Sequence, residues 1–275
     1  MTVEEQVRAG RLAEALGDLQ SQIKKAPSDP RLRIFLFQLL AVMGQWDRAL
    51  TQLEVAGELD SSALPMRQTY REVLRCEMLR RDVFAGRGAP LIFGEPAEWM
   101  ALLVYAQRAY GEGKLEEAGR LRRRAFEDAP GTAGTIDDRP FEWIADADGR
   151  LGPMLEAVMN GKYYWVPFAR LSEIQVEKPT DLRDIAWLPV TLTFTNGGQS
   201  VAFVPTRYPG SEDSADPRIV MARSTEWSQP ADDSQIPLGL GQRLLATDQG
   251  EFPLMDLRVV KLGDPVGAPA SSSLG

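Results

Sequence analysis

The most metal-like segment of the chain is an acidic turn, Asp146-Ala147-Asp148-Gly149-Arg150, which resembles the start of a calcium loop. An EF-hand loop also needs a third acidic position, a central glycine and a closing glutamate, and all three are missing here. We therefore expect a tight turn whose carboxylates accept hydrogen bonds from backbone amides or pair with Arg150. The sequence predicts no metal site and no cofactor.

Few residues of this chain could carry enzymatic chemistry. It contains no histidine, which removes Ser-His-Asp and Cys-His catalysis and every Cys/His zinc site. The single cysteine, Cys76, has no histidine to activate it, so we expect a buried structural thiol. Neighbouring acids such as Glu116-Glu117 and Asp137-Asp138 do not by their spacing face each other across a cleft, as acid–base catalysis requires. We predict that the protein is not an enzyme.

Two other clusters could serve as binding surfaces. The aromatic run Tyr163–Phe168 could form a ligand platform, although such a run more often supplies core residues and one rim residue. Four arginines between positions 120 and 124 form a basic cluster with acids nearby, which is typical of a solvated helix face. Docking of this cluster to the acidic second half or to an acidic partner remains an alternative.

The first half of the chain contains a short internal repeat. The pattern Gly-x-[Leu/Trp]-x-x-Ala begins at Gly10, Gly44 and Gly113, so the first two copies are 34 residues apart and the third follows 69 residues later. An offset of 34 is the tetratricopeptide period, and 69 is two periods plus one. Ala-Pro follows the first and third copies at the same distance, where proline ends a helix. We infer a TPR-like helical domain over residues 1–130, with roughly three helix pairs.

Apolar stripes define the helices of this array. Side chains at helical spacing cover residues 12–23, 32–43 and 99–110. Asp29-Pro30 and Glu95-Pro96 are typical of helix starts, because acids there face the positive end of the helix dipole. One more helix, at about residues 65–84, interrupts the 34-residue frame.

The repeat frame assigns a candidate protein-binding groove. TPR arrays present a concave surface lined by the first helix of each pair. A mixture of apolar, amide and basic side chains suits an amphipathic partner helix laid into such a groove. The predicted groove residues are Arg31, Ile34, Gln38 and Val42 on one helix, and Met100, Leu103, Gln107 and Tyr110 on another.

Residues 136–262 have the pattern of a mostly antiparallel β domain. Trp187–Phe194 and Gln199–Val204 flank Asn196-Gly197, which predicts a hairpin. A second hairpin is expected from Gln242–Thr247 and Phe252–Lys261 around a turn at residues 248–250. Helices followed by strands define an α+β fold, and short strands at this spacing favour a small barrel or curled sheet.

Smaller elements complete the predicted second half. We expect strands at Leu171–Val176 and Ile219–Ala222, and a short helix at Leu155–Met159 because Gly152-Pro153 precedes it. Residues 263–275 are rich in Pro, Gly, Ser and Ala and are predicted to be a disordered tail.

Composition and charge favour a cytoplasmic globular protein. The chain has 275 residues, 44% of them hydrophobic, and no apolar run approaches the roughly 18 residues of a membrane span. Its start lacks the apolar segment of a secretory signal. Residues 1–130 carry 19 basic and 19 acidic side chains, whereas residues 131–275 carry 12 and 20, so the net charge of −8 lies in the second half. We expect no nucleic-acid partner and no membrane insertion.

Spaced motifs in the second half carry a family resemblance. They are Phe141-x-Trp143-x-x-Asp146-x-Asp148-x-Arg150-Leu151-Gly152-Pro153-x-Leu155-Glu156, Gly161-Lys162-Tyr163-Tyr164-Trp165-Val166-Pro167, Leu182-x-Asp184-x-x-Trp187-x-Pro189, Val204-Pro205-x-Arg207-Tyr208, Ala222-Arg223-x-Thr225-x-Trp227 and Gly241-Gln242-Arg243. Together they resemble the ImpE/SciE/TagJ family of bacterial type VI secretion. The helical first half agrees in type and length, so the resemblance covers about residues 1–262.

The resemblance implies an accessory, non-enzymatic role in type VI secretion. It implies binding to the small subunit of the contractile sheath through that subunit's N-terminal helix. By that contact the protein would indirectly influence sheath disassembly by the associated AAA+ ATPase. Two alternatives stay open: a structural scaffold that dimerises through its acidic sheet, and a small-molecule enzyme in the β half.

Overall fold

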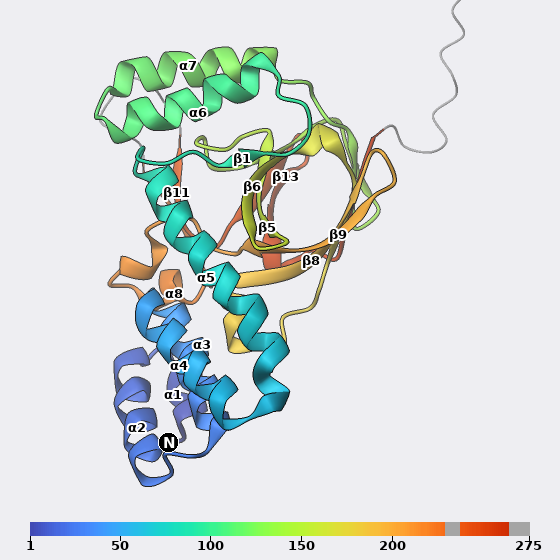
Figure 1. The fold of residues 1–275 in the computed structure, drawn as a ribbon. Coiled ribbons are helices and arrows are strands. Elements are labelled where there is room, and N and C mark those ends of the chain that lie inside the picture. The colour runs from blue at the N-terminus through green and yellow to red at the C-terminus, as the bar shows by residue number, and fades with distance from the viewer. Residues whose placement is uncertain (229–236, 264–275) are drawn as a thin grey trace, which may run out of the picture.

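The computed structural model describes residues 1–228 and 237–263. Helices make up the first half and antiparallel strands dominate the second, as the sequence predicted. Two helix pairs lie at one end of the molecule, the long helix α5 leads away from them, and a third pair lies at the other end above a curled sheet (Figure 1). Within the described residues, no helix is long and apolar enough to cross a membrane.

The first two helix pairs are α1 (Val3–Arg8) with α2 (Leu12–Lys25), and α3 (Pro30–Val42) with α4 (Trp46–Leu59). Asp29 caps α3 by accepting a hydrogen bond from the Arg31 amide, and Pro30 occupies the first turn, as expected. Gly10 and Gly44 make the turns between paired helices with φ of 76° and 69°, a conformation that favours glycine.

The remaining large helices lie where they were predicted, except that α6 begins at Glu98 and not at Glu95-Pro96. The helix expected near residues 65–84 is α5 (Leu64–Phe84). The third pair is α6 (Glu98–Gly111) with α7 (Leu115–Asp128), and Gly113 makes its turn with φ of 76°. The motif alanines Ala15, Ala49 and Ala118 are all buried, which allows close packing within each pair.

A nine-stranded sheet forms most of the second half. Its spatial order is β1 (Leu91–Ile92), β6 (Lys162–Pro167), β5 (Met154–Met159), β9 (Gln199–Pro205), β8 (Trp187–Phe194), β7 (Leu171–Val176), β14 (Val259–Leu262), β2 (Gly134–Ile136) and β3 (Arg139–Phe141). Only the β1–β6 pair is parallel. The predicted hairpin at Asn196-Gly197 joins β8 and β9.

Two smaller sheets lie beside the large one. One contains β13 (Gly250–Pro253), β12 (Leu244–Thr247) and β4 (Ile144–Asp146), and the other pairs β10 (Thr225–Ser228) with β11 (Leu238–Gly241). The large sheet is curled but open, with β1 and β3 at its edges (Figure 1). The prediction of a curled sheet is therefore confirmed.

Three local predictions were wrong. Leu155–Met159 belongs to strand β5, all of whose residues are buried, and a short apolar run does not distinguish a buried strand from a helix. Ile219–Ala222 is not a strand: Ile219 and Val220 end helix α8 (Pro217–Val220), which Asp216 caps, and Met221 and Ala222 form the following turn. The second predicted hairpin exists as β12–β13, but its second strand ends at Pro253, and β14 joins the large sheet instead.

The boundary expected at residue 130 does not separate two independent cores. One apolar cluster contains Phe37 and Leu40 of α3 together with Trp165 and Trp187 of the sheet. A second cluster fills the inside of the curled sheet, with Ile174 and Val190 among its members. Strand β1 precedes residue 130 but pairs with β6. Gly263 donates its amide to Ala133, and the rest of the predicted tail lies outside the described residues.

Candidate functional site

The predicted groove residues of α3 lie largely inside the molecule. Arg31 is exposed and Ile34 is half-buried, but Gln38 and Val42 are buried. The cause is intramolecular packing, because α3 contacts the short 3-10 helix Leu182–Ile185 from the second half.

The predicted groove residues of α6 are also mostly interior. Met100, Leu103 and Gln107 are buried. The Gln107 side chain donates a hydrogen bond to the Phe84 carbonyl at 2.7 Å, so it fastens α6 to the end of α5. Tyr110 is half-buried, and the Arg122 guanidinium lies 5.1 Å from its ring centroid.

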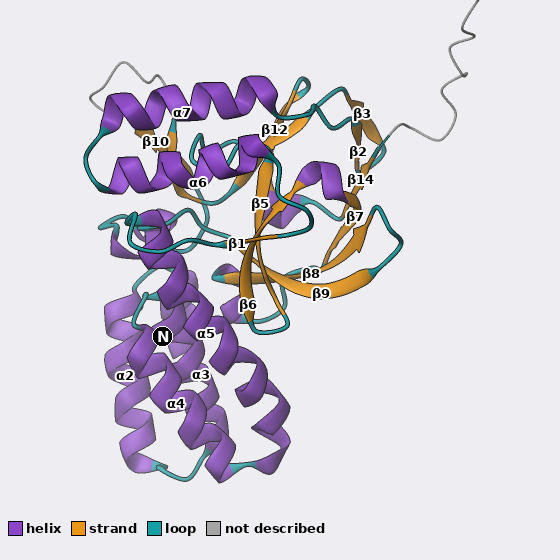
Figure 2. Cartoon of the chain, turned by 45° about the horizontal axis from the view of Figure 1, so that its top comes forward, coloured by secondary structure: helices purple, strands orange, loops and turns teal. Residues whose placement is uncertain are grey.

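The structure does not bring the two sets of groove residues together. Helices α3 and α6 lie toward opposite ends of α5 (Figure 2). The 34-residue frame assumes an uninterrupted superhelix, whereas α5 and β1 intervene, and α6 packs on α5 and on its own partner α7. A single groove lined by all eight residues is therefore not present, and only Arg31, Ile34 and Tyr110 reach the surface.

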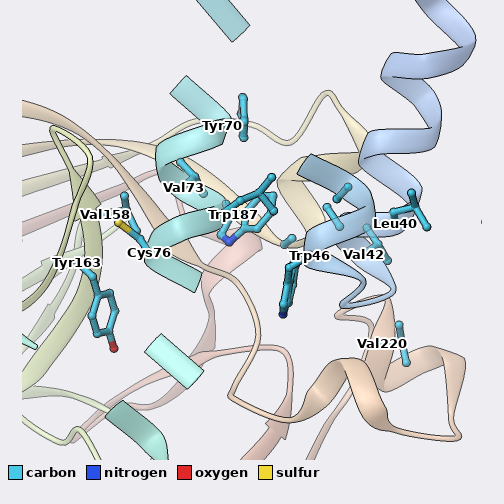
Figure 3. Packing of buried hydrophobic residues seen from close by; sticks show 14 of the residues in the cluster. Leu40, Val42, Trp46, Tyr70, Val73, Cys76, Val158, Tyr163, Trp187 and Val220 are labelled. Carbon is cyan, nitrogen blue, oxygen red and sulfur yellow. The ribbon is translucent and has the colours of Figure 1, made fainter. Parts of the chain in front are cut away.

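Residues of the second half cover the first two helix pairs. Trp187 lies between Trp46 and Tyr70, with ring centroids 5.6 and 6.1 Å away (Figure 3). A methyl group added to Gly44 would meet Cγ of Glu212 at 2.5 Å, which shows how closely this segment approaches the turn. Part of the second helix pair and its turn is therefore covered by the same chain.

Arg207 fastens this covering segment to α3. Its Nη1 donates to the carbonyl of Val42 at 2.7 Å and also to the carbonyl of Val220. Its own carbonyl accepts a hydrogen bond from Arg80 at 2.9 Å. Burial lowers the pKa of Arg207. Since the last carbonyls of a helix lack partners within the helix, a guanidinium at the end of α3 satisfies one of them.

Next to this contact lies a buried ion network between α5 and the β half. Arg80 pairs with Glu77 through Nη1 at 2.8 Å and with Glu156 through Nε at 2.7 Å. Arg243 pairs with both Glu156 and Asp146. All five side chains are buried, so breaking one pair would leave an uncompensated charge in the interior.

Aromatic side chains complete the hydrogen bonds of the network. The Tyr163 hydroxyl donates to Glu156 and accepts from Trp165 Nε1 at 2.8 Å. Trp187 Nε1 donates to Glu77 at 2.8 Å. The run Tyr163–Phe168 therefore belongs mainly to the core, with Tyr164 half-exposed, and it is not an open ligand platform.

The acidic turn has the predicted form. Asp146 accepts a hydrogen bond from the Asp148 amide at 2.9 Å, and Asp148 accepts one from the Arg150 amide at 2.8 Å. Oδ2 of Asp148 also pairs with the Arg150 guanidinium and accepts a hydrogen bond from the Gly239 amide. Both carboxylates are occupied by donors from the protein, and no group of three or more potential metal ligands occurs in the described parts of the chain.

The network shifts the acidity of its carboxylates in opposite directions. Burial disfavours ionisation of Glu156, but Arg80 and Arg243 outweigh it and lower the pKa to about 2. Asp146 has one guanidinium partner, and burial raises its pKa to about 7 despite Arg243. Glu156 is thus a permanent charge at neutral pH, positioned to hold two arginines rather than to exchange protons.

Cys76 lies in the same junction between α5 and the sheet. Its Sγ donates to the Gly161 carbonyl at 3.4 Å, and burial, followed by Glu72 and Glu77, raises its pKa to about 12. A buried thiol with this pKa is a weak nucleophile, which agrees with the predicted structural role.

Four pockets open to the surface are lined by the described residues. One, with a largely apolar lining, has a volume of about 490 Å³ and lies between the end of α7 and β4, walled by Phe126 and Trp143. A cleft of about 510 Å³ separates α5 from the β5–β6 turn, and one of about 430 Å³ lies on the α6–α7 pair beside Tyr105. A fourth, of about 360 Å³, lies between the first helix pair and residues 212–220.

Sequence reasoning assigned no interior role to the arginines that organise the core, although Arg207 and Arg243 stand in the family motifs. Arg80 and Arg207 were not singled out by spacing, because a charged residue in an amphipathic helix or at a strand end normally faces solvent. Glu156 did carry a signal: it is the only charge in the run Met154–Met159, and a carboxylate there needs a buried cationic partner.

Comparisons with known proteins agree with both halves of the fold. A family profile described as ImpE protein matches residues 138–261, and a tetratricopeptide-repeat profile matches residues 6–63. The chain is 54% identical over 258 residues to the type VI secretion system accessory component TagJ of Pseudomonas aeruginosa, which covers 94% of this chain and 90% of that protein. The crystal structure of protein VPA1032 from Vibrio parahaemolyticus is similar with a TM-score of 0.87 at 26% identity, over 96% of this chain and 98% of that one.

Proposed function

This chain belongs to the ImpE family and is an accessory protein of type VI secretion, and from that premise we propose that it binds the small subunit of the contractile sheath in the cytoplasm. The contacted element of the partner is that subunit's N-terminal helix. The role is non-enzymatic. By binding the N-terminal helix of the sheath subunit, the protein indirectly affects sheath disassembly by the AAA+ ATPase.

The observation that carries this proposal is the 54% identity to TagJ over nearly the whole chain. The charge arrangement supports it as well. Each carboxylate of the interior network has a guanidinium partner, which suits a rigid support for a binding surface better than a reaction centre. Protein-binding accessory factors need such rigid surfaces, because preorganisation limits the entropy lost on association.

Of the eight predicted groove positions, only three remain suitable for direct partner contact. Arg31 and Ile34 lie on α3 and Tyr110 lies on α6. Gln38→Ala and Gln107→Ala are poor tests of binding, because both side chains are buried and their loss would affect stability first.

Calorimetric titration of a peptide with the sequence of the sheath subunit's N-terminal helix tests the proposal. We expect saturable binding with a micromolar or tighter Kd, because a few well-placed anchors commonly dominate such contacts. A peptide of the same composition in scrambled order is the control and should show no saturation.

The competing interpretations predict different results. Equal heats from both peptides, or no binding at millimolar peptide, would contradict the proposal. In that case a concentration-dependent dimer in sedimentation would favour the scaffold alternative.

A further inference from the structure

We propose that the pocket between α7 and β4 receives an apolar anchor side chain from a partner's amphipathic helix, with basic residues of that helix facing its acidic rim. This inference rests on the proposed function and adds the surface and the chemistry of the contact. We call it the Trp143 pocket; Phe126, Pro130, Trp143, Ile144, Pro153 and Ala246 are among its lining residues.

The size and lining of the Trp143 pocket suit an apolar anchor. Its volume of about 490 Å³ lies within the usual range of binding pockets. Trp143 is 41% exposed and Phe126 is 37% exposed, although side chains of this size are usually mostly buried. Exposed aromatic walls around a pocket are typical of the anchoring positions that dominate protein interfaces.

The pocket is held by rigid elements. Gly152 has φ of 52°, and a methyl group at this position would lie 2.4 Å from the Phe126 ring. The ring therefore rests directly on the glycine backbone. On the opposite wall, Ile144 pairs with Thr247 of β12, and the Glu142 amide donates to Asp248 at 2.7 Å. A preformed pocket loses little conformational entropy when it is filled.

We call Glu127, Glu142 and Asp248, which adjoin the two aromatic walls in sequence or by a hydrogen bond, the acidic rim. Glu127 directly follows Phe126, Glu142 directly precedes Trp143, and both are exposed. Asp248 is also exposed, and the hydrogen bond from the Glu142 amide lowers its pKa, which keeps it ionised at neutral pH. Asp128 is neutralised by an ion pair with Arg124 at 2.7 Å. Glu127, Glu142 and Asp248 take part in none of the ion pairs of the described residues. Lysine or arginine beside the anchor would complement this rim.

Two other occupants fit less well. A second copy docking through the same face would bring two acidic rims together, which opposes association. A small-molecule substrate would find one carboxylate in the lining, Asp146, whose oxygens are held by Arg243 and the Asp148 amide. The lining thus offers apolar contact and the residues of the acidic rim lie outside it, an arrangement that an amphipathic basic helix matches.

The test repeats the peptide titration with variants of the full-length protein. Trp143→Ala should raise the Kd at least tenfold, and Ala145→Leu, which fills the pocket from β4, should do the same. The matched control is Tyr105→Ala, because Tyr105 is 59% exposed on α6 and lines a different cleft. The control should leave the Kd within twofold, and thermal unfolding should confirm that all variants fold.

A second pair of variants tests the charge of the rim. Glu142→Gln should weaken binding and reduce its dependence on salt, whereas Glu4→Gln, at an exposed position on α1, should change neither.

The outcomes separate this inference from the proposed function. Binding to the wild type that survives both pocket variants would overturn the Trp143 pocket and leave the proposed function standing. No saturable binding to the wild type would overturn both. A dimer abolished by Trp143→Ala would assign the pocket to a second copy, and at least tenfold tighter binding after removal of residues 264–275 would assign it to the chain's own end; either result would also overturn the inference.

Discussion

The α3–α4 and α6–α7 hairpins share one sequence motif and differ in what lies over it. A methyl group at Gly44 would meet Glu212 at 2.5 Å, whereas one at Gly113 would find no atom within 4 Å. The motif encodes local requirements, namely a glycine with positive φ and a buried alanine, and both hairpins satisfy them. What covers a hairpin depends on residues far along the chain, so identical motifs can face a protein interior or solvent.

We expect the largest loss of stability from Glu156→Gln, which weakens the support of the covered α3–α4 hairpin. Loss of the carboxylate would leave Arg80 and Arg243 partly uncompensated in the interior and loosen the contact between α5 and the sheet that covers α3. We expect the free energy of unfolding at pH 7 to fall by about 3–5 kcal/mol. Urea denaturation measures this, with the exposed Glu177→Gln as a control that should change little.

Measuring the unfolding free energies of the wild type and Glu156→Gln as a function of pH sharpens this test. The folded-state pKa of Glu156, about 2, lies below its ordinary value of 4.5. Its stabilisation is therefore fully present above pH 4.5 and lost as the pH falls toward 2. The difference in unfolding free energy between wild type and variant should shrink across that window, and a difference constant from pH 7 to 3 would contradict this account.

A smaller but localised effect is expected from Arg207→Met. The substitution leaves the carbonyls of Val42 and Val220 without the donor that now joins them, at a cost of about 2–3 kcal/mol. Arg124→Met on the open hairpin removes only an exposed i,i+4 pair and should cost less than about 0.5 kcal/mol. Equal losses in chemical denaturation would show that the two hairpins are not held differently.

The smallest expected effect compares Gly44→Ala with Gly113→Ala. Both place a side chain at positive φ, at a cost of at least about 1 kcal/mol, but only the first also collides with Glu212. Gly44→Ala should therefore lose about 1–2 kcal/mol more in thermal or urea unfolding. Adding Glu212→Ala should restore part of the additional stability lost in Gly44→Ala and none of that lost in Gly113→Ala. An equal loss of stability in the two glycine variants would argue against the collision.

The sequence predicted the local elements well because their signals are local. Asp29-Pro30 marks the start of α3, and Asn196-Gly197 marks the β8–β9 hairpin. The candidate groove could not be placed in the same way. Whether α3 packs against a partner or against the protein's own Leu182–Ile185 segment depends on how two halves of the chain pack, and helical periodicity gives only the side of α3 on which Gln38 lies.

The pairing of β1 with β6 has a consequence for how the protein is synthesised. Leu91 and Ile92 reach their partners, Tyr164 and Trp165, only after the entire α6–α7 hairpin has been translated, and β2 must wait for β14 near residue 260. Until then the sheet-facing side of α5 has nothing to pack against. A ribosome-bound fragment ending near residue 130 should therefore fold its first two helix pairs but expose the apolar side of α5, which makes completion of the sheet the late and chaperone-sensitive step of biogenesis.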